Sequence, residues 1–418
     1  MNTNEQSLAI RLNAREARVP RRVRAVLRLL EGLRGGAIAL QLPGASPLRL
    51  GEGEVVASWT VTDLAMFDQV ITSGDIGLGE SWMDGQWHCD NLSALLGLLA
   101  ANREALGRAV RGNGWSLLLH RLMHLARSNT RRGSRRNISA HYDLGNDFYR
   151  LWLDPSMTYS AAVFAQPEES LFDAQTRKYR RILDSLDAQP GQRILEVGCG
   201  WGGFAEIAAR DYGCQVHGIT LSPRQRDLAQ ARVEAGGWAD KVHFELRDYR
   251  DVAGRYDHIV SIEMIEAVGE SFWPTYYAKL KQCLAPGGRA VIQAITINES
   301  LFAGYRRGTD FIQRYIFPGG MLPTPSRVSA DAGKAGLDTL ARFDFGLDYA
   351  RTLQRWATAF NSQRSAVQVQ GFDDRFVRMW QFYLAYCEAG FRAGDLDVHH
   401  FCLAHSQAAS RIRIGSSP

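Results

Sequence analysis

Arg193-Ile-Leu-Glu-Val-Gly-Cys-Gly-Trp-Gly-Gly203 is the stretch that decides the fold of this chain. Residues 193–197 have the composition of a short buried strand, glycines follow at 198, 200, 202 and 203, and residues 204–210 have helical spacing. A strand that turns through glycines into a helix lets backbone N–H groups and the positive end of the helix approach a ligand, because no Cβ stands in the way. The stretch therefore predicts a pocket for a nucleotide-type ligand.

Two ligand classes use such a turn. The glycines fit both GxGxxG, counted from residue 198, and ExGxGxG, counted from Glu196. A dinucleotide site would carry an acidic residue about 20 positions later, at the end of the second strand. That strand, predicted at 215–220, ends in Thr220. The pattern therefore favours S-adenosylmethionine over a dinucleotide, with a tight turn that binds nothing as the remaining alternative.

Length and composition bound the class of protein. The chain has 418 residues, and single cores stop growing at about 250–300 residues, so we expect two domains. No apolar run approaches the roughly 20 residues of a membrane span, and the start lacks a signal-type apolar core. A cytoplasmic protein is expected. The six cysteines are scattered, without a CxxC pair or a Cys/His cluster, so neither a disulfide framework nor a metal site is predicted.

The net charge of +5 is modest but unevenly placed. Arginines concentrate in residues 11–34 and again in 127–136. Such patches suit an anionic surface, either phospholipid headgroups or nucleic acid, and the alternative is a solvated face with a flexible linker. Residues 19–33 also carry apolar side chains at helical spacing, which predicts a basic amphipathic helix that lies on a membrane surface or packs on the next domain.

The N-terminal part is predicted to contain three regions. Residues 1–36 form the basic amphipathic segment, 37–110 a small α+β domain, and 111–136 a helix followed by an arginine-rich linker. Within the small domain, turn signals separate three strands that suggest a meander, expected at 37–42, 48–50 and 55–61. Helices are expected at 64–72 and 92–106.

Residues 137–418 are predicted to form an α/β domain. Helical and strand patterns alternate, which is typical of a doubly wound, Rossmann-like parallel sheet. The strands are expected at 193–197, 215–220, 241–246, 256–262 and 288–297. Beyond residue 301 the pattern becomes helical and aromatic, with helices expected at 305–317, 356–362 and 375–391. These aromatic residues suit either a core or the wall of an apolar channel.

Seven ordered blocks between residue 137 and about 402 carry a family resemblance. They are HYDLGNDFY (141–149), LDPSMTYS (153–160), ILEVGCGWGG (194–203), GITLS (218–222), DYRD (248–251), IFP (316–318) and FRA (391–393). With them the chain resembles the cyclopropane-fatty-acyl-phospholipid synthase family, which includes the mycolic acid methyltransferases. The N-terminal third is similar, less specifically, to that family's small lipid-engaging domain.

The resemblance implies a class I methyltransferase that uses S-adenosylmethionine. In the implied reaction the π electrons of a cis double bond in a phospholipid acyl chain attack the methyl carbon, and loss of a proton from the resulting carbocation closes a cyclopropane ring. Such chemistry needs a dry apolar slot, aromatic faces and a base. The implied partners are unsaturated phospholipids at the anionic inner face of the membrane, reached peripherally, and not nucleic acid.

Two other functions and the oligomeric state stay open. A small-molecule methyltransferase shares these motifs, but it does not require the arginine-rich N-terminal domain. An inactive lipid-binding homologue is the other alternative, and the retained cofactor motifs argue against it. A homodimer is an alternative to a monomer.

The resemblance carries over ten cofactor-binding residues. They are Tyr159, Ser160, Gly198, Cys199, Gly200, Thr220, Leu221, Gln225, Asp248 and Tyr249. Of these, Asp248 and Tyr249 are expected beside the adenine.

The catalytic centre of the family, by the same resemblance, holds a bicarbonate ion as base. Of its five ligands this sequence keeps Glu266, Tyr349 and the backbone of Ile295, whereas the cysteine is replaced by Ala161 and the histidine by Gln293. An alanine side chain forms no hydrogen bond and a glutamine carries no positive charge, so the replacements count against bicarbonate.

The replaced ligands lead to a hypothesis about the base. A desolvated Glu266 with a raised pKa takes the proton itself or through water, and the product is a methylated alkene or a methylene branch instead of a ring. Glu263, one helical turn earlier, is expected at the surface. Cys387 matches a family cysteine sometimes marked as an active-site residue. We expect a buried structural role for it, because no base lies beside it in sequence and the reaction needs no covalent intermediate.

Overall fold

The structure is a computed structural model that describes residues 19–107 and 144–406. Its contacts divide these residues into two compact units. Unit 1 comprises the described residues of 19–107, 308–316 and 364–393, and unit 2 comprises 144–307, 317–363 and 394–406. The sequence places 308–316 and 364–393 within a continuous 137–418 domain, whereas the contacts join both segments to unit 1. The linker expected at 111–136 lies outside the described residues.

Unit 1 contains a four-stranded sheet in the order β2-β1-β3-β4. Its strands are β1 (Gly36–Gln41), β2 (Leu48–Glu52), β3 (Val55–Val61) and β4 (Trp87–Cys89). The first three lie close to their predicted positions, but the meander is wrong. Strand β1 pairs antiparallel with β2 and parallel with β3, because the chain returns to the other side of β1 after β2.

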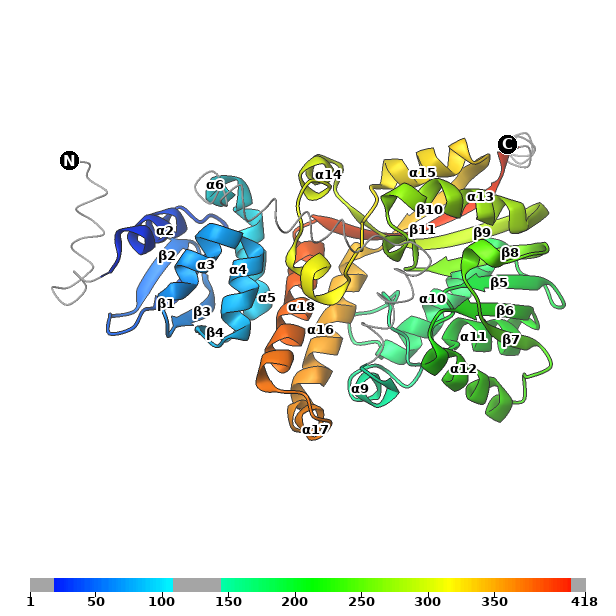
Figure 1. Ribbon diagram of the computed structural model, residues 1–418, viewed down its shortest axis with the longest axis horizontal. Coiled ribbons are helices and arrows are strands. Elements are labelled where there is room, and N and C mark those ends of the chain that lie inside the picture. Colours follow the sequence, from blue (N-terminus) through cyan, green and yellow to red (C-terminus); the bar gives the residue numbers. More distant parts are fainter. Residues whose placement is uncertain (1–18, 108–143, 407–418) are drawn as a thin grey trace. The chain divides into compact units, whose positions relative to one another are not determined.

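Unit 1 also contains helices, of which some contact this sheet and others pack on those helices (Figure 1). They are α2 (Arg21–Glu31), α3 (Ala65–Ser73), α4 (Asp75–Met83), α5 (Leu92–Ala101), α6 (Arg103–Gly107), α17 (Arg364–Val369) and α18 (Asp374–Arg392), with a π-helical turn at Ile312–Ile316. Helix α4 forms in a glycine-rich stretch for which the sequence pattern predicts no element. A Cβ at Gly77 would collide with the backbone of Gln69, and one at Gly79 with the ring of Phe311, so the glycines permit close packing.

Unit 2 is built on a seven-stranded sheet in the order β10-β11-β9-β8-β5-β6-β7. Its strands are β5 (Arg193–Val197), β6 (Gln215–Thr220), β7 (Val242–Leu246), β8 (Tyr256–Ile262), β9 (Leu284–Ile297), β10 (Leu337–Asp344) and β11 (Leu396–His405). Strands β5 to β9 are parallel, which confirms the doubly wound prediction. The antiparallel strands β10 and β11 are not predicted, because the sequence pattern of the C-terminal part indicates helices.

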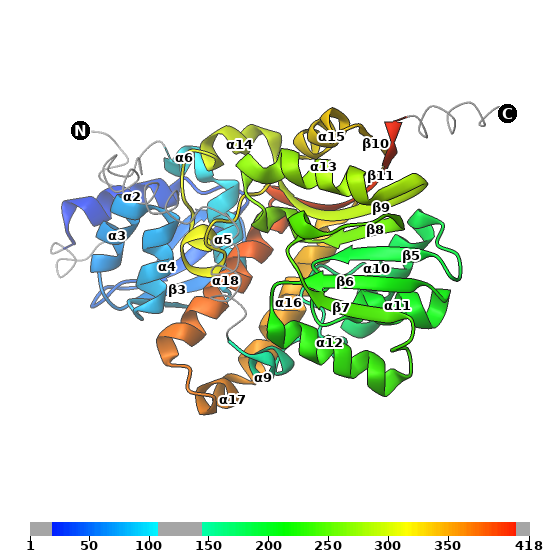
Figure 2. The same cartoon turned by 45° about the vertical axis from the view of Figure 1, so that its right-hand side comes forward.

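Helices cover both faces of this sheet (Figures 1 and 2). One face carries α10 (Leu171–Leu186), α11 (Gly203–Tyr212) and α12 (Pro223–Gly236), and the other carries α13 (Trp273–Cys283) and α15 (Pro325–Lys334). Two separate hydrophobic clusters result, one under each layer. The remaining elements of unit 2 are α9 (Asn146–Arg150), α14 (Glu299–Tyr305), α16 (Gly346–Ser362) and the 3-10 turns Tyr249–Asp251, Ile265–Ala267 and Glu270–Phe272.

Local sequence sets where the helices near the sheet edge begin. The Ser222 side chain accepts a hydrogen bond from the Gln225 N–H at 3.3 Å, and Pro223 occupies the first turn of α12. This combination is a strong helix start, because the hydroxyl satisfies an N–H group that the helix leaves open. Helix α12 therefore begins directly after β6, at the edge where the parallel strands end and where doubly wound sheets bind their ligands. Within the described residues, no helix is long and apolar enough to cross a bilayer.

Candidate active site

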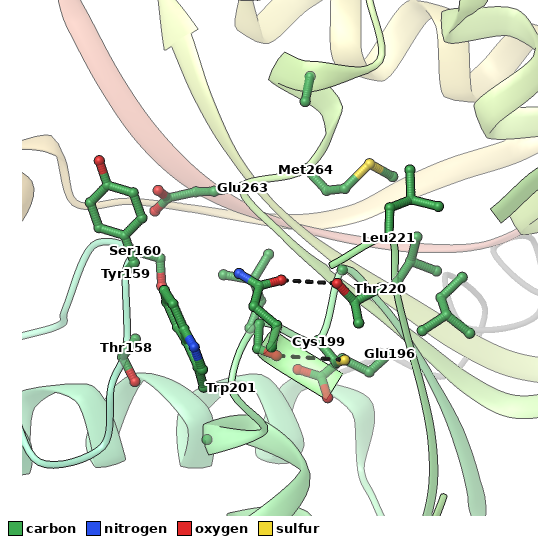
Figure 3. Close-up of a pocket in the computed structure, with 18 of the residues that line it drawn as sticks. Thr158, Tyr159, Ser160, Glu196, Cys199, Trp201, Thr220, Leu221, Glu263 and Met264 are labelled. Carbon is green, nitrogen blue, oxygen red and sulfur yellow. Dashed lines mark hydrogen bonds between the residues drawn. The ribbon is translucent and has the colours of Figure 1, made fainter. Parts of the chain in front are cut away.

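A pocket opens at the carboxyl ends of β5, β6 and β8, and every residue that lines it belongs to unit 2 (Figure 3). Its floor is the glycine turn, in which Gly198, Gly200 and Gly202 have φ angles of 84°, 50° and 82°. Side chains rarely adopt such angles, which is why glycine is needed here. A Cβ added at Gly200 would meet no atom within 4 Å. The turn thus presents bare backbone to the pocket, as a ligand lying against a helix N-terminus requires.

Nine of the ten predicted cofactor residues line this pocket. They are Tyr159, Ser160, Gly198, Cys199, Gly200, Thr220, Leu221, Gln225 and Tyr249. Thr220 donates a hydrogen bond to the Gln225 side chain at 2.9 Å, which fixes both at the end of β6. The side chains of Thr220, Leu221 and Cys199 gather on one side of the pocket in Figure 3. The arrangement fits a donor held at the glycine turn, and the role of each residue stays a prediction.

Asp248 is the predicted cofactor residue that does not line the pocket. Its carboxylate is buried and accepts hydrogen bonds from Nε and Nη2 of Arg250 at 2.8 and 2.6 Å. It also accepts the backbone N–H of Arg250 at 3.0 Å and so caps the turn that carries Tyr249. Asp248 therefore holds the adjacent pocket residue in place.

Glu263 is the largest departure from the sequence prediction. Instead of lying at the protein surface, it is half-buried and lines the pocket. One carboxylate oxygen accepts hydrogen bonds from the Ala161 backbone N–H at 2.8 Å and from Gln293 Nε2 at 2.7 Å. The other oxygen accepts from the Tyr349 hydroxyl at 2.9 Å. The carboxylate thus sits among the positions that the family resemblance assigned to the bicarbonate ion.

The backbone at Glu263 is held in an unusual conformation. Its φ angle is 48°, and the other non-glycine residues with positive φ in the described chain are Met157 and Asp187. For a residue with a long side chain the left-handed region costs about 1–2 kcal/mol. Strain of this kind persists where the surroundings over-determine it, and such positions cluster at functional sites. Here the side-chain contacts and a backbone hydrogen bond from the Glu263 N–H to the Gln293 carbonyl, at 2.8 Å, hold the conformation.

Charges around Glu263 act in opposite directions on its pKa. Enclosure by the protein is the largest influence and raises the pKa above its ordinary value, and the Ala161 N–H, the Lys178 ammonium and the donors from Gln293 and Tyr349 offset only part of this rise. Lys178 is fully buried, and its Nζ donates to the Ser160 hydroxyl at 2.6 Å. Burial lowers the lysine pKa, and the nearby carboxylates oppose that change. Sequence reasoning missed Lys178, because nothing in a helical pattern marks a buried lysine as part of a site.

Glu266 and Ile295 come together as predicted, but outside the pocket lining. The Ile295 N–H donates to one Glu266 carboxylate oxygen at 2.5 Å, and the other oxygen is buried without a partner among the described residues. Burial, followed by the negative charge of Glu263, raises the pKa of Glu266 to about 8. At neutral pH Glu266 is therefore a neutral acid. A raised pKa is part of the hypothesis that makes Glu266 the base, and this role stays a prediction. Glu263, which lines the pocket and which three donors face, is a second candidate for the base.

Gln293 is buried and links the pocket to a histidine that sequence reasoning missed. Its side-chain oxygen accepts a hydrogen bond from His400 Nε2 at 2.9 Å. The two residues are far apart in the chain, but His400 on β11 lies directly opposite Gln293 on β9. No local motif contains this pair, so only the pairing of the two strands reveals it.

Aromatic rings surround the end of the pocket that holds Glu263. The ring of Tyr159 lies 5.3 Å from that of Trp356 and 5.5 Å from that of Tyr149, between centroids. Tyr349 packs edge-on against Trp356 at 6.1 Å. Figure 3 shows the Glu263 carboxylate at the same end of the pocket as Tyr159. Aromatic faces attract cations, so this end suits a reaction that passes through a positive charge.

Cys387 belongs to α18 of unit 1, whereas the pocket is lined by unit 2 alone. Burial is the main cause that raises the pKa of its thiol, and the nearby Asp310 carboxylate raises it further. The residue is therefore an uncharged thiol at neutral pH, as a structural role requires.

Comparison with known proteins identifies the family. A sequence model described as mycolic acid cyclopropane synthetase matches residues 129–401. The chain belongs to this family. Tuberculostearic acid methyltransferase of Mycobacterium tuberculosis is 42% identical over 342 residues, which cover 79% of either chain. Cyclopropane-fatty-acyl-phospholipid synthase of Escherichia coli K12 is 33% identical over 354 residues, covering 83% of this chain and 87% of the relative.

Solved structures of family members support the same assignment. The cyclopropane synthase MmaA2 from Mycobacterium tuberculosis is 32% identical, covers 65% of this chain and 98% of its own, and has a TM-score of 0.61. The mycolic acid cyclopropane synthase CmaA1, in complex with SAH and CTAB, is 30% identical with the same TM-score, over 64% of this chain and 97% of its own. The protein is therefore a class I methyltransferase that uses S-adenosylmethionine and acts on lipids. Coclaurine N-methyltransferase, 14% identical with a TM-score of 0.60, shares the fold alone.

Proposed function

We propose that this enzyme methylates the cis double bond of an unsaturated phospholipid acyl chain and releases a methylene-branched or methylated alkene, not a cyclopropane. The observation that carries the proposal is the Glu263 carboxylate, which Ala161, Gln293 and Tyr349 hold where the family resemblance implies a free ion. A base fixed to the backbone reaches only the C–H bonds that its position allows. The proposal is also consistent with a 42% identical relative that is named a methyltransferase, not a cyclopropane synthase.

The proposed reaction conserves atoms and charge. The π electrons of the alkene form a bond to the methyl carbon while the carbon–sulfur bond of the donor breaks, which leaves S-adenosylhomocysteine and a carbocation on the chain. The ring of Tyr159, which lines the pocket and packs against Trp356, stabilises the cation. Glu263 then accepts a proton from the carbon that received the methyl group, and that C–H electron pair becomes the double bond of a methylated alkene. For a methylene branch, a hydride first shifts from the methylated carbon to the cationic carbon, and Glu263 then accepts a proton from the added methyl group. The chain gains one carbon, and no oxidant or reductant is required.

We also propose that the enzyme reaches its substrate at an anionic membrane surface through exposed arginines. In α2 the apolar side chains Val23, Leu27 and Leu30 are buried, whereas Arg21, Arg22, Arg24 and Arg28 are exposed. The amphipathic helix therefore packs its apolar side on its own unit, and its arginines face solvent, where they can approach headgroups. The second predicted arginine cluster, at 127–136, lies outside the described residues.

Product analysis tests the proposed reaction. The purified protein is incubated with labelled S-adenosylmethionine and vesicles of a mono-unsaturated phospholipid, and the released fatty acids are examined by mass spectrometry before and after ozonolysis. A branched alkene and a cyclopropane both gain one carbon, but only the alkene is cleaved by ozone. An ozone-resistant product would overturn the branched-alkene proposal. Absence of label from the lipid would overturn the substrate class.

A further inference from the structure

We propose that His400 is a positioning residue which, by holding the Gln293 side chain in one orientation, keeps Glu263 ionised and aimed into the pocket. The inference rests on the proposed role of Glu263 as the base. It concerns a residue outside the pocket lining, on a strand that the sequence does not predict.

Strand geometry places His400 behind Gln293. Strands β11 and β9 are antiparallel, and the two residues face each other in register. Side chains alternate between the faces of a strand, so the neighbouring His399 points the other way. There it bonds Thr296 at 2.8 Å and Asp344 at 2.7 Å. Both adjacent histidines are buried, but only His400 is linked to the pocket.

The hydrogen bonds define the state of His400. Its Nε2 contacts the Gln293 side-chain oxygen, which is only an acceptor, so Nε2 carries the hydrogen. Its Nδ1 is buried and has no hydrogen-bond partner among the described residues. Burial lowers the pKa of His400 well below its ordinary value, and the charges of Lys178 and Arg181 on α10 and of His399 act in the same direction. His400 is therefore a neutral donor at neutral pH.

The donor from His400 decides which end of the Gln293 amide meets Glu263. With the oxygen held by His400, the NH2 group faces the carboxylate at 2.7 Å and favours its charged form. An amide turned the other way would place its oxygen lone pairs against the carboxylate and disfavour ionisation. Lys178, Glu266 and Tyr349 also act on Glu263, but none of them contacts the Gln293 oxygen in the structure. His400 therefore fixes the oxygen end of this amide, while a longer contact from the Gln293 NH2 group to the Ala161 carbonyl, at 3.5 Å, supports the same orientation.

The test replaces His400, the hydrogen-bond donor to Gln293, and follows the ionisation of Glu263. We expect His400→Leu to move the acidic limb of the pH–rate profile for methyl transfer to higher pH by about one unit, because Glu263 then binds a proton more readily. The KM for S-adenosylmethionine should change little. The pKa of the Glu263 carboxyl can also be measured by infrared titration of the protein without S-adenosylmethionine. The carboxyl band is assigned by its loss in Glu263→Gln, and its pKa should rise by the same amount in His400→Leu. His400→Gln, whose side-chain NH2 can reach the Gln293 oxygen, should restore the wild-type profile.

His399→Leu is the matched control, since it removes an equally buried histidine from the adjacent position. It should lower thermal stability without moving the pH profile. Equal shifts in His400→Leu and His399→Leu, or none in either, would overturn the inference. If His400→Leu does not fold, Gln293→Met removes the amide itself and must produce the same rise. Wild-type methyl transfer onto the acyl chain is read separately, so failure of the proposed function is distinguishable from failure of this inference.

Discussion

Gln293 holds Glu263 twice, since its backbone carbonyl accepts the Glu263 N–H at 2.8 Å and its side-chain amide donates to the Glu263 carboxylate at 2.7 Å. One contact stabilises the strained backbone and the other orients the charge. A single residue within β9 therefore couples the conformation of residue 263 to the position of its carboxylate.

Replacing Glu263 should separate catalysis from stability. Glu263→Gly removes the base and relieves a φ angle of 48°, so we expect methyl transfer to fall by about a hundredfold or more. The folded state should keep its stability or gain up to about 1 kcal/mol. Turnover under saturating donor and thermal unfolding measure the two effects. Asp187→Gly is the control, because it relieves a similar angle of 57° at the exposed end of α10, and it should leave turnover unchanged.

The space left by the Glu263 side chain should accept a small carboxylate. In Glu263→Gly, added bicarbonate or formate meets the Ala161 N–H, the Gln293 amide and the Tyr349 hydroxyl that held the lost carboxylate. We expect partial recovery of turnover that saturates with anion concentration, whereas chloride at equal ionic strength should have no effect. Recovery by chloride as well would show that salt, not a base, is responsible.

A side chain added to the glycine turn should allow the protein to fold but should weaken the binding of S-adenosylmethionine. Gly200→Ala adds a methyl group that meets no protein atom, yet the group projects into the pocket at a φ of 50°. We expect a strain of about 1–2 kcal/mol and a loss of affinity for S-adenosylmethionine of about tenfold or more, measured by calorimetric titration. Gly237→Ala carries the same kind of strain at the end of α12, also with open space around it. The affinity of Gly237→Ala for S-adenosylmethionine should match that of the wild type.

The raised pKa of Glu266 predicts how stability depends on pH. This carboxyl moves from an ordinary 4.5 to about 8 in the folded protein. Between those values the unfolded chain releases the proton while the folded protein retains it, so the free energy of unfolding falls as pH rises from about 4.5 to 8. Glu266→Gln removes this dependence. Its melting temperature relative to wild type should therefore rise steadily between pH 5 and pH 8, and a constant difference would contradict the raised pKa.

Membrane binding should depend on the exposed face of α2. Near an anionic surface each arginine contributes about 1 kcal/mol, so glutamine at positions 21, 24 and 28 together should weaken binding to anionic vesicles about a hundredfold. Vesicle co-sedimentation at low and high salt measures the effect, and Arg255→Gln on the exposed surface of unit 2 is the control. Equal binding of the triple variant and the wild type would rule out this face.

How much of the site the sequence predicts depends on how local each contact is. The glycine turn and the motif residues at 159–160 and 220–221 belong to contiguous stretches, and they line the pocket as expected. The predicted surface position of Glu263 is wrong. Its separation of three residues from Glu266 resembles one helical turn, so the sequence suggests a regular helix at a position where the chain does not form one. In the structure residue 263 has a left-handed backbone directly after β8, and the helical turn covers only Ile265–Ala267.

The C-terminal strands show the same limit for the fold. Strand β11 carries the partner of Gln293, but its position beside β9 depends on a pairing across about 100 residues. Its aromatic and histidine-rich sequence, which follows the long apolar helix α18, gives no alternation that distinguishes it from a buried helical segment. Neither the strand nor His400 could therefore be inferred from local pattern.

The interleaving of the two units along the chain limits how this enzyme can be taken apart. Helix α18 packs on α4 and α5, although more than 250 residues of sequence separate them. Loss of the first hundred residues, for instance through a new start codon downstream, would strip the apolar side of α18 of these partners and expose it to water. Neither unit is therefore a continuous segment of the chain that could be expressed without the other.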